Sequence, residues 1–148
     1  MNVAQRVAIV TGGGGGIGGA LVARLAREGA RVVVADLDPD TARVVSESVN
    51  ADHPGSTVSA GADVSDTAQI EQLIALAESA FGPVDLYFAN AGIAGAPGLD
   101  ASEQDWDLSI DVNLRAHIRA ATLLVPRWLE RGEGYFVSTT RTAPAPIP

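Results

Sequence analysis

RVAIVTGGGGGIGG, from Arg6 to Gly19, is the stretch that decides how the rest of the chain folds. Val7 to Val10 is an apolar run rich in β-branched residues, which is typical of a strand buried on both faces of a parallel sheet. Five consecutive glycines, Gly12 to Gly16, follow it. Apolar residues then recur every four positions, the spacing of one helix face: Ile17, Leu21 and Leu25. The stretch therefore predicts a strand, a glycine turn and a helix in direct succession.

The glycine turn and the start of this helix suit an anion. Backbone N–H groups in the first turn of a helix lack intrahelical partners and carry partial positive charge. Glycine lets a pyrophosphate approach these groups closely. A run of five glycines can also be a flexible linker. A linker is not expected between a buried strand and an amphipathic helix only a few residues apart, so we favour dinucleotide binding here.

Composition limits the classes of protein that the chain can belong to. With 148 residues, 47% of them apolar, we expect one folded α/β domain. A net charge of −8 argues against nucleic-acid and anionic-membrane partners. The sequence has no cysteine and no apolar run of membrane-spanning length, and His53 and His117 have no partner at metal-ligand spacing. We expect a cytoplasmic protein with no metal site. All ten basic residues are arginine, so no ammonium group is available.

The second predicted strand, Arg31 to Ala35, ends at an acidic residue. Asp36 and Leu37 follow it, about 20 residues beyond the glycines. A carboxylate at this position can accept hydrogen bonds from both ribose hydroxyls of an adenosine, and its charge would repel a 2′-phosphate. An aspartate before the turn at Pro39 is also ordinary loop chemistry. The position favours the first interpretation, and therefore NAD over NADP.

The rest of the chain alternates strands with helices. The patterns predict helices over 41–50, 66–81 and 102–131 and strands over 56–62, 84–89 and 134–139. This alternation implies a parallel sheet with right-handed crossovers. If the strand order is 3-2-1-4, the glycine turn faces Asn90-Ala91-Gly92 across a crevice where such folds bind ligands. In the long helix, the residues spaced for burial are Ile110, Leu114, Ile118, Ala121, Val125 and Leu129.

Five features in this order resemble the short-chain dehydrogenase/reductase family: Thr11 to Gly18, Asp36, Asp63-Val64, Asn90-Ala91-Gly92 and Val112-Asn113. The resemblance covers the chain from Val3 to about Thr139. It implies a three-layer, Rossmann-like, doubly wound parallel sheet of order 3-2-1-4-5. It also implies an NAD-binding domain over 1–139, while 140–148 forms a proline-rich tail. Two Asn often precede Ala-Gly in the family, and Ala89 replaces the first one here.

The resemblance implies a role for each cofactor-site residue. Those at the pyrophosphate and nicotinamide ribose would be Gly12, Gly14, Gly15, Gly16, Ile17 and Gly18. Asp36 and Leu37 would contact the adenine ribose, and Asp63 and Val64 would flank the adenine. Asn90, Ala91 and Gly92 would border the floor of the crevice, next to Val112.

Most of the family's Asn-Ser-Tyr-Lys catalytic tetrad has no match. Asn113 matches the asparagine, which positions a water in the proton relay and which we expect on a buried helix face. Arg141 stands where the serine belongs, with Thr140 one residue short. The only tyrosines are Tyr87 and Tyr135, on strands, and no lysine exists to lower the pKa of a catalytic tyrosine. We therefore expect a truncated or frame-shifted product, or a chain cut short, that lacks the C-terminal part of the fold.

Three functions follow from these observations. The first is an NAD-dependent oxidoreductase that moves hydride between nicotinamide and an alcohol or carbonyl substrate. Loss of the proton donor and its activating cation would cost this chain orders of magnitude in rate. The second is a non-catalytic NAD-binding module, and the third is a non-functional fragment. The family resemblance also implies a homo-oligomer.

Overall fold

The computed structural model describes residues 2–94 and 100–140. The chain alternates strands with helices, as the sequence predicts. In order, the elements are β1 (Val7–Thr11), α1 (Gly16–Arg27), β2 (Arg31–Asp36), α2 (Pro39–Asp52), β3 (Thr57–Gly61), α3 (Thr67–Ala80), β4 (Leu86–Ala89), α4 (Glu103–Ile110), the π-helical turn η2 (Asp111–Arg115), α5 (Ala116–Arg131) and β5 (Tyr135–Ser138). No helix in these described stretches is long and apolar enough to cross a membrane.

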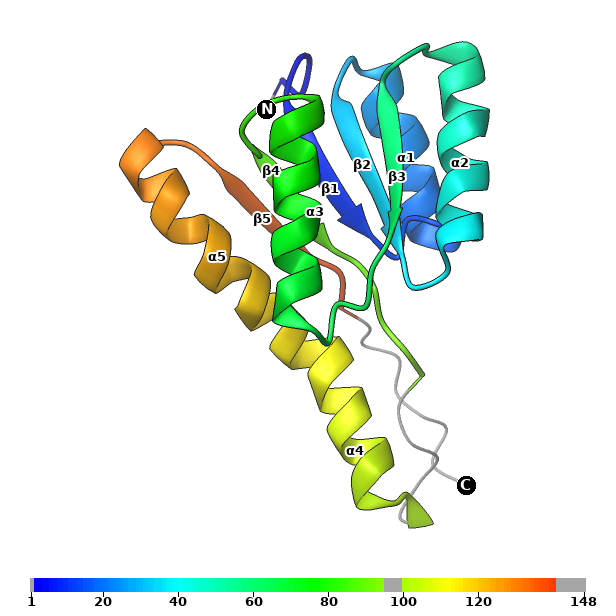
Figure 1. Cartoon of the computed structure of the whole chain (residues 1–148), viewed down its shortest axis with the longest axis vertical. Helices are drawn as coiled ribbons and strands as arrows, with labels where there is room; N and C mark the ends of the chain where they lie inside the picture. The colour runs from blue at the N-terminus through cyan, green and yellow to red at the C-terminus, as the bar shows by residue number, and fades with distance from the viewer. Residues whose placement is uncertain (1, 95–99, 141–148) are drawn as a thin grey trace.

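The five strands form one parallel sheet of order β3-β2-β1-β4-β5. The predicted order and fold class are confirmed. Side chains on one face of the sheet pack with α1 and α2, and those on the other face pack with α3 and α5. Figure 1 shows the resulting three layers, with α3 and α5 in front of the sheet and α1 and α2 behind it. Because all strands run the same way, their carboxyl ends meet at one edge of the sheet.

Local sequence signals explain where the elements begin and end. Asp38 and Asp66 are the N-caps of α2 and α3, and each side chain accepts a hydrogen bond from the backbone N–H two residues on. Gly132 ends α5 with φ +77°, a left-handed conformation that glycine adopts without steric cost. Asp85, predicted inside the fourth strand, instead precedes it. Its carboxylate accepts a hydrogen bond from Val7 N at 2.9 Å, which ties the start of β4 to β1.

The long helix expected over 102–131 is present, with a π-helical turn inside it, but the expectation of which side is buried is wrong. The segment is α4, η2 and α5 in succession, and the side chains predicted to be buried are largely exposed: Ile110, Leu114, Ile118, Val125 and Leu129. The buried row is Val112, Ala116, Ala120, Leu124 and Trp128. Both rows have helical spacing, so periodicity alone cannot choose between them.

Trp128 fixes which side of α5 faces the sheet. Its indole Nε1 donates a hydrogen bond to Val84 O at 2.7 Å, so this buried polar group is satisfied. A Cβ on Gly134 would lie 2.0 Å from Trp128 Cγ, so the chain can pass the ring only because residue 134 is glycine. Trp128 thereby packs against the segment that leads into β5, which pairs with β4.

Candidate functional site

The glycine turn is shaped by close backbone contacts. A Cβ on Gly18 would lie 2.0 Å from Gly12 O, and one on Gly12 would lie 2.9 Å from Ala91 Cα. Gly12 and Gly16 also have positive φ angles, +64° and +52°, which disfavour other residues. The first helical bond of α1 runs from Gly19 N to Gly15 O at 2.9 Å. The backbone N–H groups just before Gly19 lie in the first turn of α1 and have no carbonyl acceptor one turn earlier. Such groups attract anions.

Two amides of the turn are already bonded within the protein. Gly13 N donates to Ala35 O at 2.8 Å, and Gly14 N donates to Asp36 Oδ2 at 2.9 Å. These bonds join the turn to the end of β2. The N–H groups that remain for an anion are therefore those nearest the start of α1.

Thr11 and Asn90 join the turn to β4 on its other side. The buried Thr11 hydroxyl donates to Phe88 O at 3.1 Å and accepts from the backbone N–H of Asn90 and of Ala91. The Asn90 side chain donates to Thr11 O at 3.1 Å and to Gly12 O at 3.3 Å. The ends of β1 and β4 are thus fixed relative to one another.

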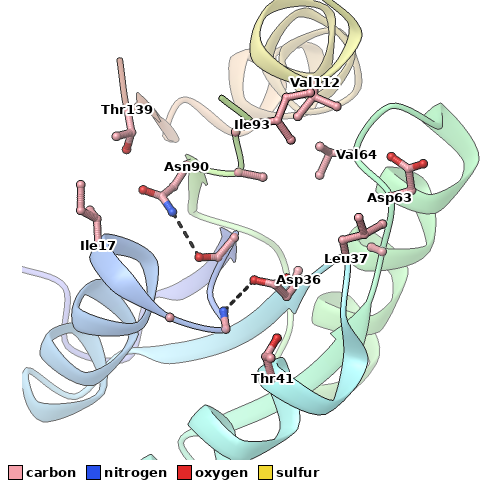
Figure 2. A pocket seen from close by; sticks show the side chains of 17 residues that line it. Ile17, Asp36, Leu37, Thr41, Asp63, Val64, Asn90, Ile93, Val112 and Thr139 are labelled. Carbon is pink, nitrogen blue, oxygen red and sulfur yellow. Dashed lines mark hydrogen bonds between the residues drawn. The ribbon is translucent and has the colours of Figure 1, made fainter. Parts of the chain in front are cut away.

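These segments surround a cavity of about 650 Å³ at the carboxyl edge of the sheet. Figure 2 shows Ile17, Asp36, Asn90, Val112 and Thr139 around it. The predicted site residues that line the cavity are Gly12, Gly14, Gly15, Ile17, Asp36, Leu37, Asp63, Val64, Asn90, Ala91, Gly92 and Val112. Gly16, Gly18 and Asn113 are absent from the lining.

Five lining residues were not predicted: Ala35, Thr41, Ala62, Ile93 and Thr139. Three of them are sequence neighbours of predicted residues: Ala35 precedes Asp36, Ala62 precedes Asp63 and Ile93 follows Gly92. Thr139 follows β5, so the rule that carboxyl ends of parallel strands meet at one edge could have identified it. Thr41 lies in the first turn of α2 and has no signal in the sequence pattern.

Asp63 and Val64 form the wall opposite Ile17 (Figure 2). Asp63 N donates to Gln69 Oε1, and Asp63 Oδ1 accepts from Ser65 N, both at 2.8 Å. Val64 belongs to a small apolar cluster with Val112 and Ala116. One wall is therefore apolar, beside a carboxylate whose orientation is fixed by the loop after β3.

Asn113 is exposed rather than on a buried face, so that expectation is wrong. The residue of this pair that is buried is Val112. Asn113 Oδ1 accepts from Ile93 N at 2.9 Å, and its Nδ2 donates to Ile93 O at 3.1 Å. The amide therefore ties η2 to the chain after β4, so Asn113 borders the cavity through Ile93 rather than lining it.

Neither tyrosine lies in the cavity lining among the described residues. Tyr87 is buried on β4, stacked on Phe136, and burial raises the pKa of its hydroxyl. Tyr135 is partly exposed at the start of β5 and lines a second hollow of about 440 Å³. The hydroxyl groups that do line the cavity belong to Thr41 and Thr139. Arg141, aligned with the family's serine, lies outside the described residues, as do residues 142–148 of the tail.

The cavity has the size and position of a ligand site. Its volume is that of a small-molecule or cofactor site, which typically lies between about 300 and 1,000 Å³. A helix N-terminus faces it on one side, and it contains carboxylates at the ends of β2 and β3. A position between β1 and β4, where the strand order reverses, is where open α/β sheets bind ligands.

Comparisons with known proteins agree with this geometry. The profile described as short chain dehydrogenase matches residues 6–144. The 1-deoxy-11-beta-hydroxypentalenate dehydrogenase of Streptomyces avermitilis is 36% identical over 135 residues, which cover 89% of this chain and 50% of that protein. A short-chain dehydrogenase from Novosphingobium aromaticivorans superposes with a TM-score of 0.89 at 31% identity, over 98% of this chain and 57% of that one.

The structure of levodione reductase has a TM-score of 0.86 at 32% identity, over 93% of this chain and 54% of its own. The chain therefore spans about half the length of each of these relatives. The matched half contains the glycine turn, the five strands and η2.

Proposed function

The chain belongs to the short-chain dehydrogenase family, and on that premise we propose that it serves NAD-dependent hydride transfer between nicotinamide and an alcohol or carbonyl substrate. Its own part is to hold the dinucleotide, and residues 1–139 form the domain that does so. The bound nicotinamide would supply or accept the hydride. The relatives described as a dehydrogenase and as levodione reductase support this substrate class.

The observation that carries the proposal is the joint position of the glycine turn and the cavity. Gly12, Gly15 and Ile17 line the cavity at the start of α1, where unpaired N–H groups favour a pyrophosphate. Any side chain at Gly12 or Gly18 would collide with backbone atoms, so these two positions of the turn must be glycine. A backbone this close to a cavity is what a bound diphosphate requires.

Asp36 supports NAD rather than NADP. Its carboxylate lines the cavity at the end of β2, beside Leu37. A carboxylate can accept hydrogen bonds from a ribose diol, whereas a 2′-phosphate would bring a second negative charge against it. Asp63 and Val64 would then lie beside the adenine, and Asn90 to Gly92 beside the nicotinamide half.

We also expect this chain to be catalytically incomplete. Asn113 is the one residue that matches the family's tetrad, and its amide is bonded to Ile93. The sequence has no lysine, and the two tyrosines lie away from the cavity. Binding of dinucleotide without turnover is the expected behaviour, and rapid hydride transfer by these 148 residues alone would contradict this part of the proposal.

Self-association completes the proposal. Leu114, Ile118 and Leu129 expose more than half of their surface along one side of η2 and α5. Rows of exposed large apolar side chains mark interaction surfaces. A second copy of the chain is the partner that the family resemblance implies.

The test of the cofactor proposal is calorimetric titration with NADH and with NADPH. We expect wild-type protein to bind NADH more tightly than NADPH. Asp36→Asn should weaken NADH binding and reduce the ratio of the NADPH and NADH dissociation constants by about tenfold or more. The reason is that hydrogen bonds to a charged group contribute about 1.5–3 kcal/mol.

Asp40→Asn is the matched control. It removes an equal charge from the exposed first turn of α2, where Asp40 pairs with Arg43 outside the cavity. It should leave the NADH:NADPH preference close to that of wild type. An equal NADH:NADPH preference in wild type and in Asp36→Asn would show that Asp36 is not part of the site. No binding of either dinucleotide would contradict the proposal as a whole.

A further inference from the structure

We infer that Gly14 sets the cofactor preference by holding Asp36 in place, an inference that rests on the proposed function. A glycine turn needs its glycines for different reasons at different positions. At Gly14 the reason is neither the diphosphate nor the backbone conformation. It is the space around residue 14, where Thr41 and the carboxylate of Asp36 both lie within 3 Å of the position that a Cβ would take.

The carboxylate of Asp36 is held by two backbone hydrogen bonds. Gly14 N donates to Asp36 Oδ2 at 2.9 Å, and Asp38 N donates to Asp36 Oδ1 at 3.3 Å. Figure 2 shows the first of these bonds, with Thr41 pointing toward it from α2. Each carboxylate oxygen thus receives one backbone N–H, and each keeps a further lone pair for a ligand.

Other side chains occupy the space that a side chain on residue 14 would need. A Cβ there would lie 2.3 Å from Thr41 Oγ1 and 2.8 Å from Asp36 Oδ2. Thr41 cannot turn away freely, because its hydroxyl donates to Asp38 O at 2.9 Å. Gly14 has no positive φ, so the obstacle to a side chain is space and not backbone strain. An alanine at this position must displace the carboxylate, the threonine, or both.

A carboxylate held in one orientation discriminates between NADH and NADPH more strongly than a mobile one. A free Asp36 side chain could rotate away from an incoming 2′-phosphate and let water screen the repulsion. The two backbone N–H groups prevent that rotation and leave the remaining lone pairs in fixed directions for a diol. Discrimination against NADPH therefore depends on the bond to Gly14 as well as on the charge of Asp36.

The experiment measures the ratio of the NADPH and NADH dissociation constants in Gly14→Ala. We expect the ratio to fall about tenfold, with a smaller loss of NADH affinity, because a displaced carboxylate loses a charge-assisted hydrogen bond. Gly19→Ala, one turn into α1, is the matched control. The nearest atom to a Cβ there is Gly13 O at 3.6 Å, which is ordinary contact, so the ratio should stay that of wild type.

A double-mutant cycle separates positioning from general damage. If Gly14 acts through Asp36, adding Gly14→Ala to Asp36→Asn should not change the ratio further. A merely structural effect would weaken both dinucleotides in either background without changing their ratio. An unchanged ratio in Gly14→Ala, or an equal change in both backgrounds, would overturn the inference.

A measurement on wild-type protein keeps the inference testable if Gly14→Ala does not fold. The Gly14 amide proton should exchange with solvent about tenfold more slowly in ligand-free wild type than in Asp36→Ala, which lacks the acceptor. Equal exchange rates would overturn the inference. If wild type binds neither dinucleotide, the proposed function fails. If it prefers NADH and Gly14→Ala keeps the same ratio, this inference alone fails.

Discussion

His117 shows how the surroundings of one residue change its chemistry. Its ring Nδ1 lies 2.8 Å from Ser138 Oγ, where α5 passes the end of β5. Partial burial of the ring lowers its pKa below the ordinary value, because a charged imidazolium loses hydration there. The folded protein therefore binds this proton less readily than the unfolded chain does.

This shift predicts a pH dependence of stability. The contribution of neutral His117 is fully present above the unfolded pKa of about 6.5 and is lost as pH falls through the lower, folded value. His117→Gln should therefore remove part of the decline in the free energy of unfolding between about pH 7.5 and pH 5. Urea unfolding across that range measures it. An identical pH profile in wild type and His117→Gln would show that His117 does not contribute.

Single residues at the ends of strands were predictable from the sequence to different degrees. Asp36 and Asn90 could be identified because Asp36 ends β2 and Asn90 follows β4, and the carboxyl ends of both strands face the cavity. The exposure of Asn113 could not, because it depends on which side of η2 faces the sheet. The bond from Gly14 to Asp36 spans 22 residues and depends on the exact path of the turn.

Among the elements, α5 presents two apolar rows, one buried against the sheet and one exposed. Sequence periodicity detects both rows and assigns neither to the core. The choice is made by contacts distant in sequence, such as Trp128 with Val84 O and with Gly134. The strands were easier to predict, because short runs rich in β-branched residues and bounded by turn residues are too short for a typical helix.

The exposed row predicts the oligomeric state. Leu114→Glu with Ile118→Glu should weaken self-association by at least about tenfold, because an interface core does not tolerate unpaired carboxylates. Sedimentation velocity at several protein concentrations measures the shift toward monomer. Val44→Glu, which places one carboxylate on an exposed apolar position of α2, should leave the assembly intact. A wild-type chain that stays monomeric at every concentration would contradict self-association.

At the scale of the whole molecule, the site exists because five parallel strands end at one edge. The glycine turn, Asp36, Asp63 and Asn90 are far apart in sequence and meet there only through the strand order β3-β2-β1-β4-β5. That order follows from short crossovers and buried strands, so the general position of the cavity could be predicted. The first turn of α2 supplies Thr41 and the segment after β4 supplies Ile93, and the places of both depend on the detailed path of the chain after each strand.

The central claim is that a dinucleotide occupies this cavity with its diphosphate at the start of α1. Amide chemical shifts of the ¹⁵N-labelled chain, recorded during titration with NADH, test it most directly. We predict that the changes concentrate on the glycine turn, Asp36 and Asn90, while the second hollow around Trp128 and Tyr135 stays unchanged. Changes confined to that second hollow, or no changes at saturating NADH, would contradict the account.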